Sequence, residues 1–358
     1  FGAAGDQIGT AVAISGDTIV IGAPGTTVKQ MGQGAVFVFT RSGTIWSQHQ
    51  ILTANDSAAN DNFGASVAIS GNTLAVGAIG DDFGAIQQQG SAYIFIRNGI
   101  TWMQQQKLIA NDGTEGDGFG SSVSISGDTV AVGASSDDIG ANVDQGAAYV
   151  FVRNSTTQPV WVQQQKLTAN DGAASDRFGG DLALSGDTIV VGALGDDIGA
   201  NLNQGSAYVF TRSVRTWTQA QKLSAQGGAA GDQFATSVAL SGNTILAGAT
   251  TALVGNVRQG SSYVFVGSAC PAIALDPATL PDARPGVPYN QTLVGAGGTG
   301  PYQFSLSEGA LPPGLTLSPT GQLSGTPTTP GMYRFTITAT ILSSLCPGSR
   351  SYTLTVSS

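Results

Sequence analysis

Histidine and cysteine, which serve many active sites, are nearly missing from this chain of 358 residues. It contains one histidine, His49, and two cysteines. Serine and cysteine nucleophiles usually rely on a histidine base, and His49 stands where the next similar stretch has Gln105, which indicates a surface residue. Two carboxylates could hydrolyse a glycosidic bond without histidine, but the same acids recur along the chain and no pair stands out. We therefore expect a protein that is not an enzyme.

Basic residues and long apolar runs are also scarce. The chain has 14 Lys and Arg against 23 Asp and Glu, with a net charge of −9 and a pI of about 4.4. Nucleic-acid binding needs clustered basic residues, and a membrane span needs about eighteen consecutive apolar residues, so we expect neither. The 51 glycines and 41% hydrophobic residues are typical of turn-rich β-structure, not disorder. We expect an extracellular or cell-surface protein whose leader has been removed, since the chain opens in mid-repeat.

The chain does contain five copies of one sequence motif of about 18 residues, such as DNFGASVAISGNTLAVGA and DGFGSSVSISGDTVAVGA. They recur about every 56 residues, and a fixed period of this length indicates stacked supersecondary units. Each copy is anchored on one apolar residue, and these anchors are Ile8, Phe63, Phe119, Phe178 and Phe234.

Each unit reads as four short strands. The first two are joined by Gly followed by Asp or Asn, as at Gly16-Asp17 and Gly71-Asn72, which suits a two-residue hairpin. Four-stranded antiparallel units repeated around an axis make a β-propeller. The sequence therefore predicts an all-β fold with a five-repeat propeller over residues 1–267. We expect a closed ring of five blades, and the alternative is that these blades are one part of a longer ring.

The recurring Phe-Gly and Gly-Ala pairs, seen at Phe63-Gly64 and Gly77-Ala78, resemble the FG-GAP repeats of integrin α-subunit heads and many bacterial surface proteins. The resemblance implies a propeller that takes part in recognition or adhesion. Many such repeats carry a calcium loop between the first two strands of a blade, but here only the Ser-Gly-Asp/Asn-Thr turn stands there. One carboxylate cannot supply the six to eight oxygens that calcium prefers. We therefore expect no cofactor and no metal.

Two sets of aspartates recur. The first lies two residues before each anchor, and because Asp accepts backbone N–H bonds in turns, we interpret it as structural: Asp6, Asp61, Asp117, Asp176 and Asp232. The second forms pairs in the loop between the second and third strands of the middle units, and these are our candidate ligand-binding residues for a protein, a glycan or a hard cation: Asp81, Asp82, Asp137, Asp138, Asp196 and Asp197. Solvated turns are the alternative for these pairs.

The last strand of each unit is rich in glutamine, as in Gln104-Gln105-Gln106, and ends in Lys-Leu. We interpret the glutamines as outward positions on the rim. The lysines at 107, 166 and 222 are typical of charges that discourage pairing between strand edges.

Residues 268–358 change character, being rich in Pro, Thr and Gly. Segments such as Leu311-Pro312-Pro313-Gly314 resemble the immunoglobulin-like domains of bacterial surface proteins, which implies a β-sandwich that acts as a spacer. Short strands with frequent turns support a sandwich independently. Cys270 and Cys346 lie near its two ends, an arrangement that favours a disulfide in an oxidising compartment, although two free thiols remain possible.

The fifth unit lacks the Trp-containing outer strand that follows the other four. A segment before Phe1 could complete that blade, or the open edge could accept a strand from another molecule. Two functions therefore stay open. The first is a recognition or adhesion protein whose propeller loops bind a protein or glycan. The second is a structural subunit of an extracellular filament or coat, in which copies of the chain join by strand exchange.

Overall fold

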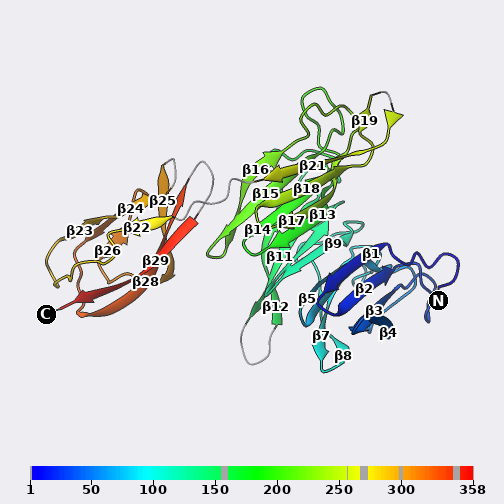
Figure 1. Cartoon of the computed structure of the whole chain (residues 1–358), viewed down its shortest axis with the longest axis horizontal. Coiled ribbons are helices and arrows are strands. Elements are labelled where there is room, and N and C mark those ends of the chain that lie inside the picture. The colour runs from blue at the N-terminus through cyan, green and yellow to red at the C-terminus, as the bar shows by residue number, and fades with distance from the viewer. Residues whose placement is uncertain are drawn as a thin grey trace. The chain divides into compact units, whose positions relative to one another are not determined.

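The computed structural model describes residues 2–154, 160–255, 257–266, 273–297, 301–341 and 347–357. These residues form strands and turns, with no helix among them (Figure 1). The chain divides into two compact units, Phe1–Phe265 and Val266–Ser358. The predicted fold class is confirmed: the first unit consists of antiparallel blades and the second of strands that fit an immunoglobulin-like domain.

The first four blades have four strands each, paired in chain order. Blades 1 and 2 contain β1 (Ala11–Ser15), β2 (Thr18–Ala23), β3 (Ala35–Ser42), β4 (Ile45–Leu52), β5 (Phe63–Ser70), β6 (Thr73–Ala78), β7 (Ser91–Asn98) and β8 (Thr101–Leu108). Blades 3 and 4 contain β9 (Phe119–Ser126), β10 (Thr129–Ala134), β11 (Ala147–Asn154), β12 (Val160–Leu167), β13 (Phe178–Ser185), β14 (Thr188–Ala193), β15 (Ser206–Ser213) and β16 (Thr216–Leu223).

Blade 5 has three strands, β17 (Phe234–Ser241), β18 (Thr244–Ala249) and β21 (Ser261–Val266). A small hairpin of β19 (Leu253–Val254) and β20 (Val257–Arg258) occupies the loop between β18 and β21. The outer side of β21 pairs with no strand in the described part of the chain. The fifth blade thus ends on an open edge.

The Phe-Gly anchor explains how one blade joins the next. Phe63 is fully buried, and its ring meets Tyr93 and Phe95 of its own blade edge-on, with centroids 5.6 and 5.9 Å apart. Its backbone N–H donates to the carbonyl of Gln33 in blade 1 over 3.0 Å. Gly64 adopts φ +94°, and a Cβ there would lie 2.7 Å from the Ala35 carbonyl oxygen. Glycine suits this close approach because an added Cβ would clash at Gly64, although blade 5 has Ala235 at the equivalent position with φ +64°.

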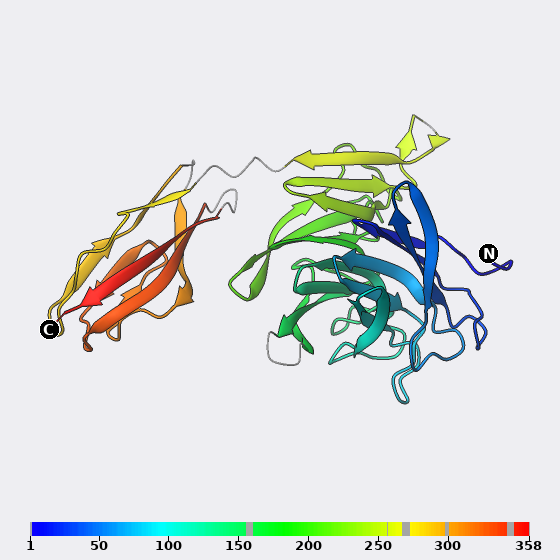
Figure 2. The same ribbon diagram turned by 60° about the horizontal axis from the view of Figure 1, so that its bottom comes forward.

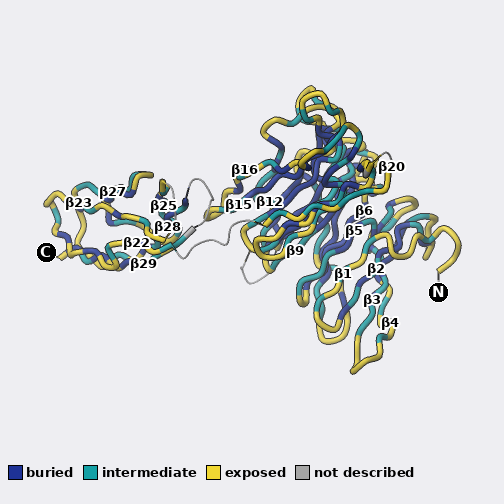
Figure 3. The backbone as a smooth tube through the Cα atoms, turned by 45° about the horizontal axis from the view of Figure 1, so that its top comes forward, coloured by how far each residue is buried: buried dark blue, intermediate teal, exposed yellow. Residues whose placement is uncertain are grey.

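The hydrophobic core lies between blades. Val20 and Val38 of blade 1 pack with Phe63, Val76 and Tyr93 of blade 2 in one buried cluster. The same arrangement recurs between blades 2 and 3, 3 and 4, and 4 and 5, and buried segments are concentrated in the middle blades (Figure 3). We call the side of a blade that meets the preceding blade its upstream face, and the opposite side its downstream face. Burial of each face depends on a neighbouring blade.

The glutamines of the outer strands connect neighbouring blades. Gln106 accepts from the backbone N–H of Trp161 and donates to its carbonyl, over 2.8 Å in each case. Gln50 with Trp102 and Gln165 with Trp217 form equivalent pairs. The sequence predicted outward rim positions for these glutamines, whereas in the structure their amides extend backbone pairing from one outer strand to the next.

The blades form an open arc, so the expectation of a closed five-bladed ring was wrong. Each blade packs on its successor, but among the described residues no comparable packing joins blade 5 back to blade 1. Figures 1 and 2 show the blades following one another in chain order, from the blue blade 1 to the yellow-green blade 5. Closure depends on the tilt that side chains impose between blades, which the number of repeats does not determine.

The second unit consists of short strands in three sheets, ordered β22-β24, β23-β27-β26 and β25-β28-β29. Their bounds are β22 (Ala274–Asp276), β23 (Tyr289–Thr292), β24 (Val294–Ala296), β25 (Tyr302–Gly309), β26 (Leu315–Leu317), β27 (Gln322–Gly325), β28 (Gly331–Ile341) and β29 (Pro347–Val356). One core cluster, which includes Leu323, Ile337 and Leu354, holds them together. Cys270 and Cys346 lie outside the described residues, so their pairing stays a prediction.

Candidate binding surface

The turn aspartates before the anchors are bound to the backbone. Each carboxylate accepts an N–H from the residue three positions earlier over 2.5 to 2.7 Å, and the donors are Ala3, Ala58, Thr114, Ala173 and Ala229. Burial raises the pKa of Asp61 and Asp117, and it raises the pKa of Asp176 to about 6. This geometry gives each carboxylate a role within its own turn.

The first aspartate of each predicted binding pair is buried in a polar network. Asp137 is 3% exposed and accepts from the hydroxyl of Tyr149 over 2.5 Å. The ammonium of Lys166 lies 2.9 Å from Asp137 and 2.8 Å from Asp112, which comes from the connection between blades 2 and 3. The other two networks repeat this plan around Lys107 and Lys222.

Charge and burial compete in these networks. Burial alone would raise the pKa of Asp112, but the hydrogen bond and charge of Lys166 outweigh it and leave that pKa below its usual value. Burial would lower the pKa of Lys166, but its two carboxylate partners raise it. These two shifts keep Lys166 charged and Asp112 ionised in the native protein. Such a network fastens a connection between blades onto the following blade.

The second aspartate of each pair has a different environment. Asp82, Asp138 and Asp197 are exposed, and each accepts one N–H from the residue six positions further along its own loop, over 2.7 to 2.8 Å. One oxygen of each carboxylate thus shapes the loop while the group stays open to solvent. Of the six predicted binding residues, the structure leaves these three accessible and encloses the other three, Asp81, Asp137 and Asp196.

Exposed aliphatic side chains share the loops of Asp138 and Asp197 in blades 3 and 4, and Met31 holds the equivalent position in blade 1. Met31, Val143 and Leu202 are 70%, 57% and 60% exposed, and each lies three residues before the glycine that precedes a third strand. Their carbonyls accept N–H bonds from the turn of the next blade, as from Ser175 to Val143 over 2.8 Å. The loops are therefore joined from blade to blade. We call the surface formed by these acids and aliphatic residues the loop surface.

The aliphatic part of the loop surface was not predicted from the sequence, because a single Met, Val or Leu in a loop gives no local signal. Only the shared spacing from Gly34, Gly146 and Gly205 could have revealed it.

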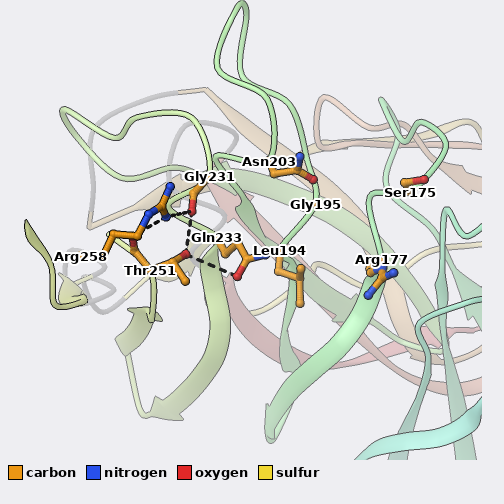
Figure 4. A pocket seen from close by; sticks show the side chains of 9 residues that line it. All are labelled: Ser175, Arg177, Leu194, Gly195, Asn203, Gly231, Gln233, Thr251 and Arg258. Atoms are coloured by element: carbon orange, nitrogen blue, oxygen red, sulfur yellow. Dashed lines mark hydrogen bonds between the residues drawn. The ribbon is translucent and has the colours of Figure 1, made fainter. Parts of the chain in front are cut away.

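A cavity of about 460 Å³ adjoins this surface between blades 4 and 5. Arg177 and Arg258 lie on opposite sides of Leu194 and Gln233, and Arg258 donates to the carbonyls of Gly231 and Thr251 (Figure 4). The arginines bring positive charge to an otherwise acidic protein.

Metal ligands are not assembled in the described residues, where no group of three or more His, Cys, Asp and Glu side chains could hold a metal ion. Within each buried network the cation that faces the acids is a lysine. A helix long and apolar enough to cross a membrane is likewise not found in the described part of the chain.

Comparison with known families matches this architecture. The FG-GAP repeat model matches residues 2–39, 46–95, 102–151, 161–210 and 217–265. The chain belongs to the FG-GAP repeat family. Four of the five matched FG-GAP segments begin on Trp46, Trp102, Trp161 and Trp217, so the repeat runs from the outer strand of one blade through the third strand of the next. Residues 271–357 match the family described as "Putative Ig domain". Both domain types are typical of extracellular or surface proteins.

A comparison with curated proteins finds no relative of this FG-GAP chain. Among solved structures, it is similar to the crystal structure of the GH74 xyloglucanase from Xanthomonas campestris. The two are 14% identical with a TM-score of 0.37, and the match covers 73% of this chain and 37% of the xyloglucanase. The chain thus spans well under half of that protein, and this likeness says nothing about activity.

Proposed function

We propose that this FG-GAP protein is a non-enzymatic recognition or adhesion protein of the cell surface or extracellular space. Its propeller loops bind a protein or glycan ligand, and its Ig-like domain acts as a spacer. The observation that carries the proposal is the loop surface, where exposed Asp82, Asp138 and Asp197 recur from blade to blade and exposed aliphatic residues share the loop in blades 3 and 4. The buried networks beneath it keep these loops in place.

The chemistry of the loop surface favours a protein ligand with basic side chains. Carboxylates attract lysine and arginine and steer their approach, while Met31, Val143 and Leu202 offer apolar area that a binding partner can cover. Sugar rings are commonly held by stacking on aromatic faces, but Trp102, Trp161 and Trp217 are each 2% exposed. A glycan would therefore have to bind without these tryptophans.

The test is the attachment of beads coated with the 358-residue chain. We would count beads held on surfaces coated with basic extracellular proteins, with neutral polysaccharides or with albumin. We expect retention on the basic proteins, and a sharp loss for the triple variant D82N/D138N/D197N, because asparagine keeps the loop hydrogen bond but removes the charge. Attachment no greater than on albumin, or equal attachment by the variant, would overturn the proposal.

A matched control exists at the other end of the blades. Asp17, Asp128 and Asp187 are 67–74% exposed in the turns between first and second strands, where each pairs with an arginine. Asn72 fills the same position in blade 2 and accepts from Arg97 over 3.0 Å, so asparagine is tolerated there. The variant D17N/D128N/D187N therefore removes the same charge away from the loop surface and should leave attachment unchanged.

A structural subunit is the second candidate, favoured by the open edge of β21. Gln221 of blade 4 is exposed and has no hydrogen-bond partner among the described residues, whereas Gln50, Gln106 and Gln165 bind the outer strand of the following blade. A strand from another molecule could supply that partner. A labelled peptide with the sequence of β8 tests this candidate by fluorescence anisotropy. Binding that Gln221→Ala weakens would support it, and no binding would exclude it.

A further inference from the structure

The upstream face of blade 1 is an apolar sheet surface without a cover. Val12 is 66% exposed, whereas its equivalents Val67 and Val123 in blades 2 and 3 are 8% exposed. Ile14 is 63% exposed, whereas its equivalent Ile125 is 8% exposed. The difference arises because blades 2 to 5 have a preceding blade to pack on, and in the described structure nothing covers this face of blade 1.

Among the described residues of the first unit, the downstream face of blade 5 is open in the same way. Leu246 is 44% exposed, whereas Val20 and Val190 at the equivalent position are fully buried. Val264 is 63% exposed, whereas its equivalent Ile94 is fully buried. The two ends of the arc thus present the two halves of the interface that joins every pair of neighbouring blades.

The open faces also retain the backbone features of that interface. Between blades 2 and 3, a Cβ on Gly77 would lie 2.0 Å from the carbonyl oxygen of Gly120, so the two strands approach very closely. The equivalents at the two ends of the arc are Gly248 and Gly9. Gly9 keeps φ +94°, although a Cβ placed on it would have no other atom within 4 Å. A positive φ is cheap only for glycine, and here the empty space beside it fits an incoming strand.

A serine hydroxyl is the third feature of the interface between blades. Ser66 and Ser122 each donate to a carbonyl of the next blade over 2.8 Å, to Gly120 and Gly179 respectively. Ser237 holds the equivalent position in blade 5, is exposed, and has no acceptor among the described residues. Its natural acceptor would be the carbonyl of a residue equivalent to Gly9.

We propose that the downstream face of blade 5 docks on the upstream face of blade 1 of a second copy of this chain. The occupant is identified by the four interfaces within the chain, which join the same kinds of face in the same order. The contact is head-to-tail, so it generates a ring of copies or an open filament. It uses sheet faces and is independent of any strand added to the edge of β21.

The experiment measures the mass of the full chain by light scattering at increasing concentration. We expect the wild type to form dimers and larger species. Val12→Asp blocks the upstream face and Val264→Asp blocks the downstream face, so each variant alone should be monomeric. A mixture of the two should form a dimer and nothing larger. In that dimer the intact downstream face of Val12→Asp docks on the intact upstream face of Val264→Asp, and the two blocked faces remain free.

Ile100→Asp is the matched control, since Ile100 is 74% exposed in the turn between β7 and β8 and lies on neither face. It should associate like the wild type. Both test sites are exposed, so the variants should keep the wild-type melting temperature. A wild type that stays monomeric at all concentrations would overturn the proposal. So would a mixture that fails to dimerise, or an Ile100→Asp variant that is monomeric.

Discussion

Replacing His49 by glutamine should stabilise the propeller. The indole N–H of Trp161 donates to Gln105 over 3.3 Å, and that of Trp217 donates to Gln164 over 3.2 Å. The equivalent acceptor for Trp102 would come from position 49, but His49 instead contacts the carbonyl of Ile100 over 2.6 Å. The indole N–H of Trp102, a residue that is 2% exposed, is left without a partner.

The size of the gain follows from what the substitution changes. A buried donor without an acceptor costs about 1–3 kcal/mol, and a typical hydrogen bond contributes about 1 kcal/mol. The bonds in the later blades are long, and the exposed bond between His49 and Ile100 is lost. We therefore expect His49→Gln to raise the free energy of unfolding by about 1 kcal/mol. For a unit of this size, that corresponds to a rise of about 2–4 °C in melting temperature.

Tryptophan fluorescence is the assay, because the chain has 4 tryptophans and all of them lie in the propeller. Thermal melting followed by this signal therefore reports that unit alone. His49→Ala is the control, since it removes the bond to Ile100 without adding an acceptor, and it should not raise the melting temperature. Gln164→Ala should lower it by leaving Trp217 unpaired. A melting temperature of His49→Gln at or below that of the wild type would mean that the unpaired indole N–H of Trp102 does not destabilise the propeller.

Four further predictions concern the charges and cysteines. Lys166→Met should lower the free energy of unfolding by about 3 kcal/mol in urea titrations, because it leaves buried Asp137 without its cation. Adding Asp137→Asn should recover part of that loss, and an equal loss in both variants would contradict the network. The raised pKa of Asp176 means that the native state binds the proton of this carboxyl more tightly than the unfolded state does. Protonation of Asp176 therefore stabilises the fold fully below about pH 4, and this stabilisation is lost as the pH rises through about 6. Asp176→Asn should therefore gain melting temperature relative to the wild type from pH 4 to 7, and a constant difference would count against this assignment. Chelation of calcium should leave the melting temperature unchanged, and a fall would reveal a bound ion. Reduction should add the mass of two hydrogens to the chain through Cys270 and Cys346, whereas an unchanged mass would mean free thiols.

The repeat and the strands of each blade could be predicted from the sequence, because they depend on period and turn residues within about 56 positions. Contacts between blades could not. Gln106 looked like a rim residue in its own strand, yet its partner Trp161 lies 55 positions away. Lys107 looked like a charge that protects a strand edge, yet it binds Asp56 and buried Asp81. In both cases the local pattern gave the polarity of the side chain correctly but not its partner.

The distribution of the lysine networks explains why they are structural. Blades 2, 3 and 4 each contain the complete set of two aspartates, a tyrosine and a lysine. In blade 1 the aspartate of the loop, the tyrosine and the lysine are replaced together by Thr26, Phe37 and Ile51. In blade 5 the two aspartates are replaced by Gly227 and Ala252, and the strand that would hold the lysine does not follow β21 among the described residues.

The charged residues of the network are lost together in blades 1 and 5, as expected from the cost of burying one unpaired charge. A lysine or an aspartate left alone at such a site would be a buried charge without its counterion, which costs more than an apolar replacement of the whole set. A ligand site shows no such constraint, because one exposed carboxylate can be lost without penalty to the fold. The exposed Asp82, Asp138 and Asp197 are free of the constraint, since each accepts one N–H from its own loop while its charge stays open to solvent. That contrast separates the acids that hold the blades together from those available to a partner.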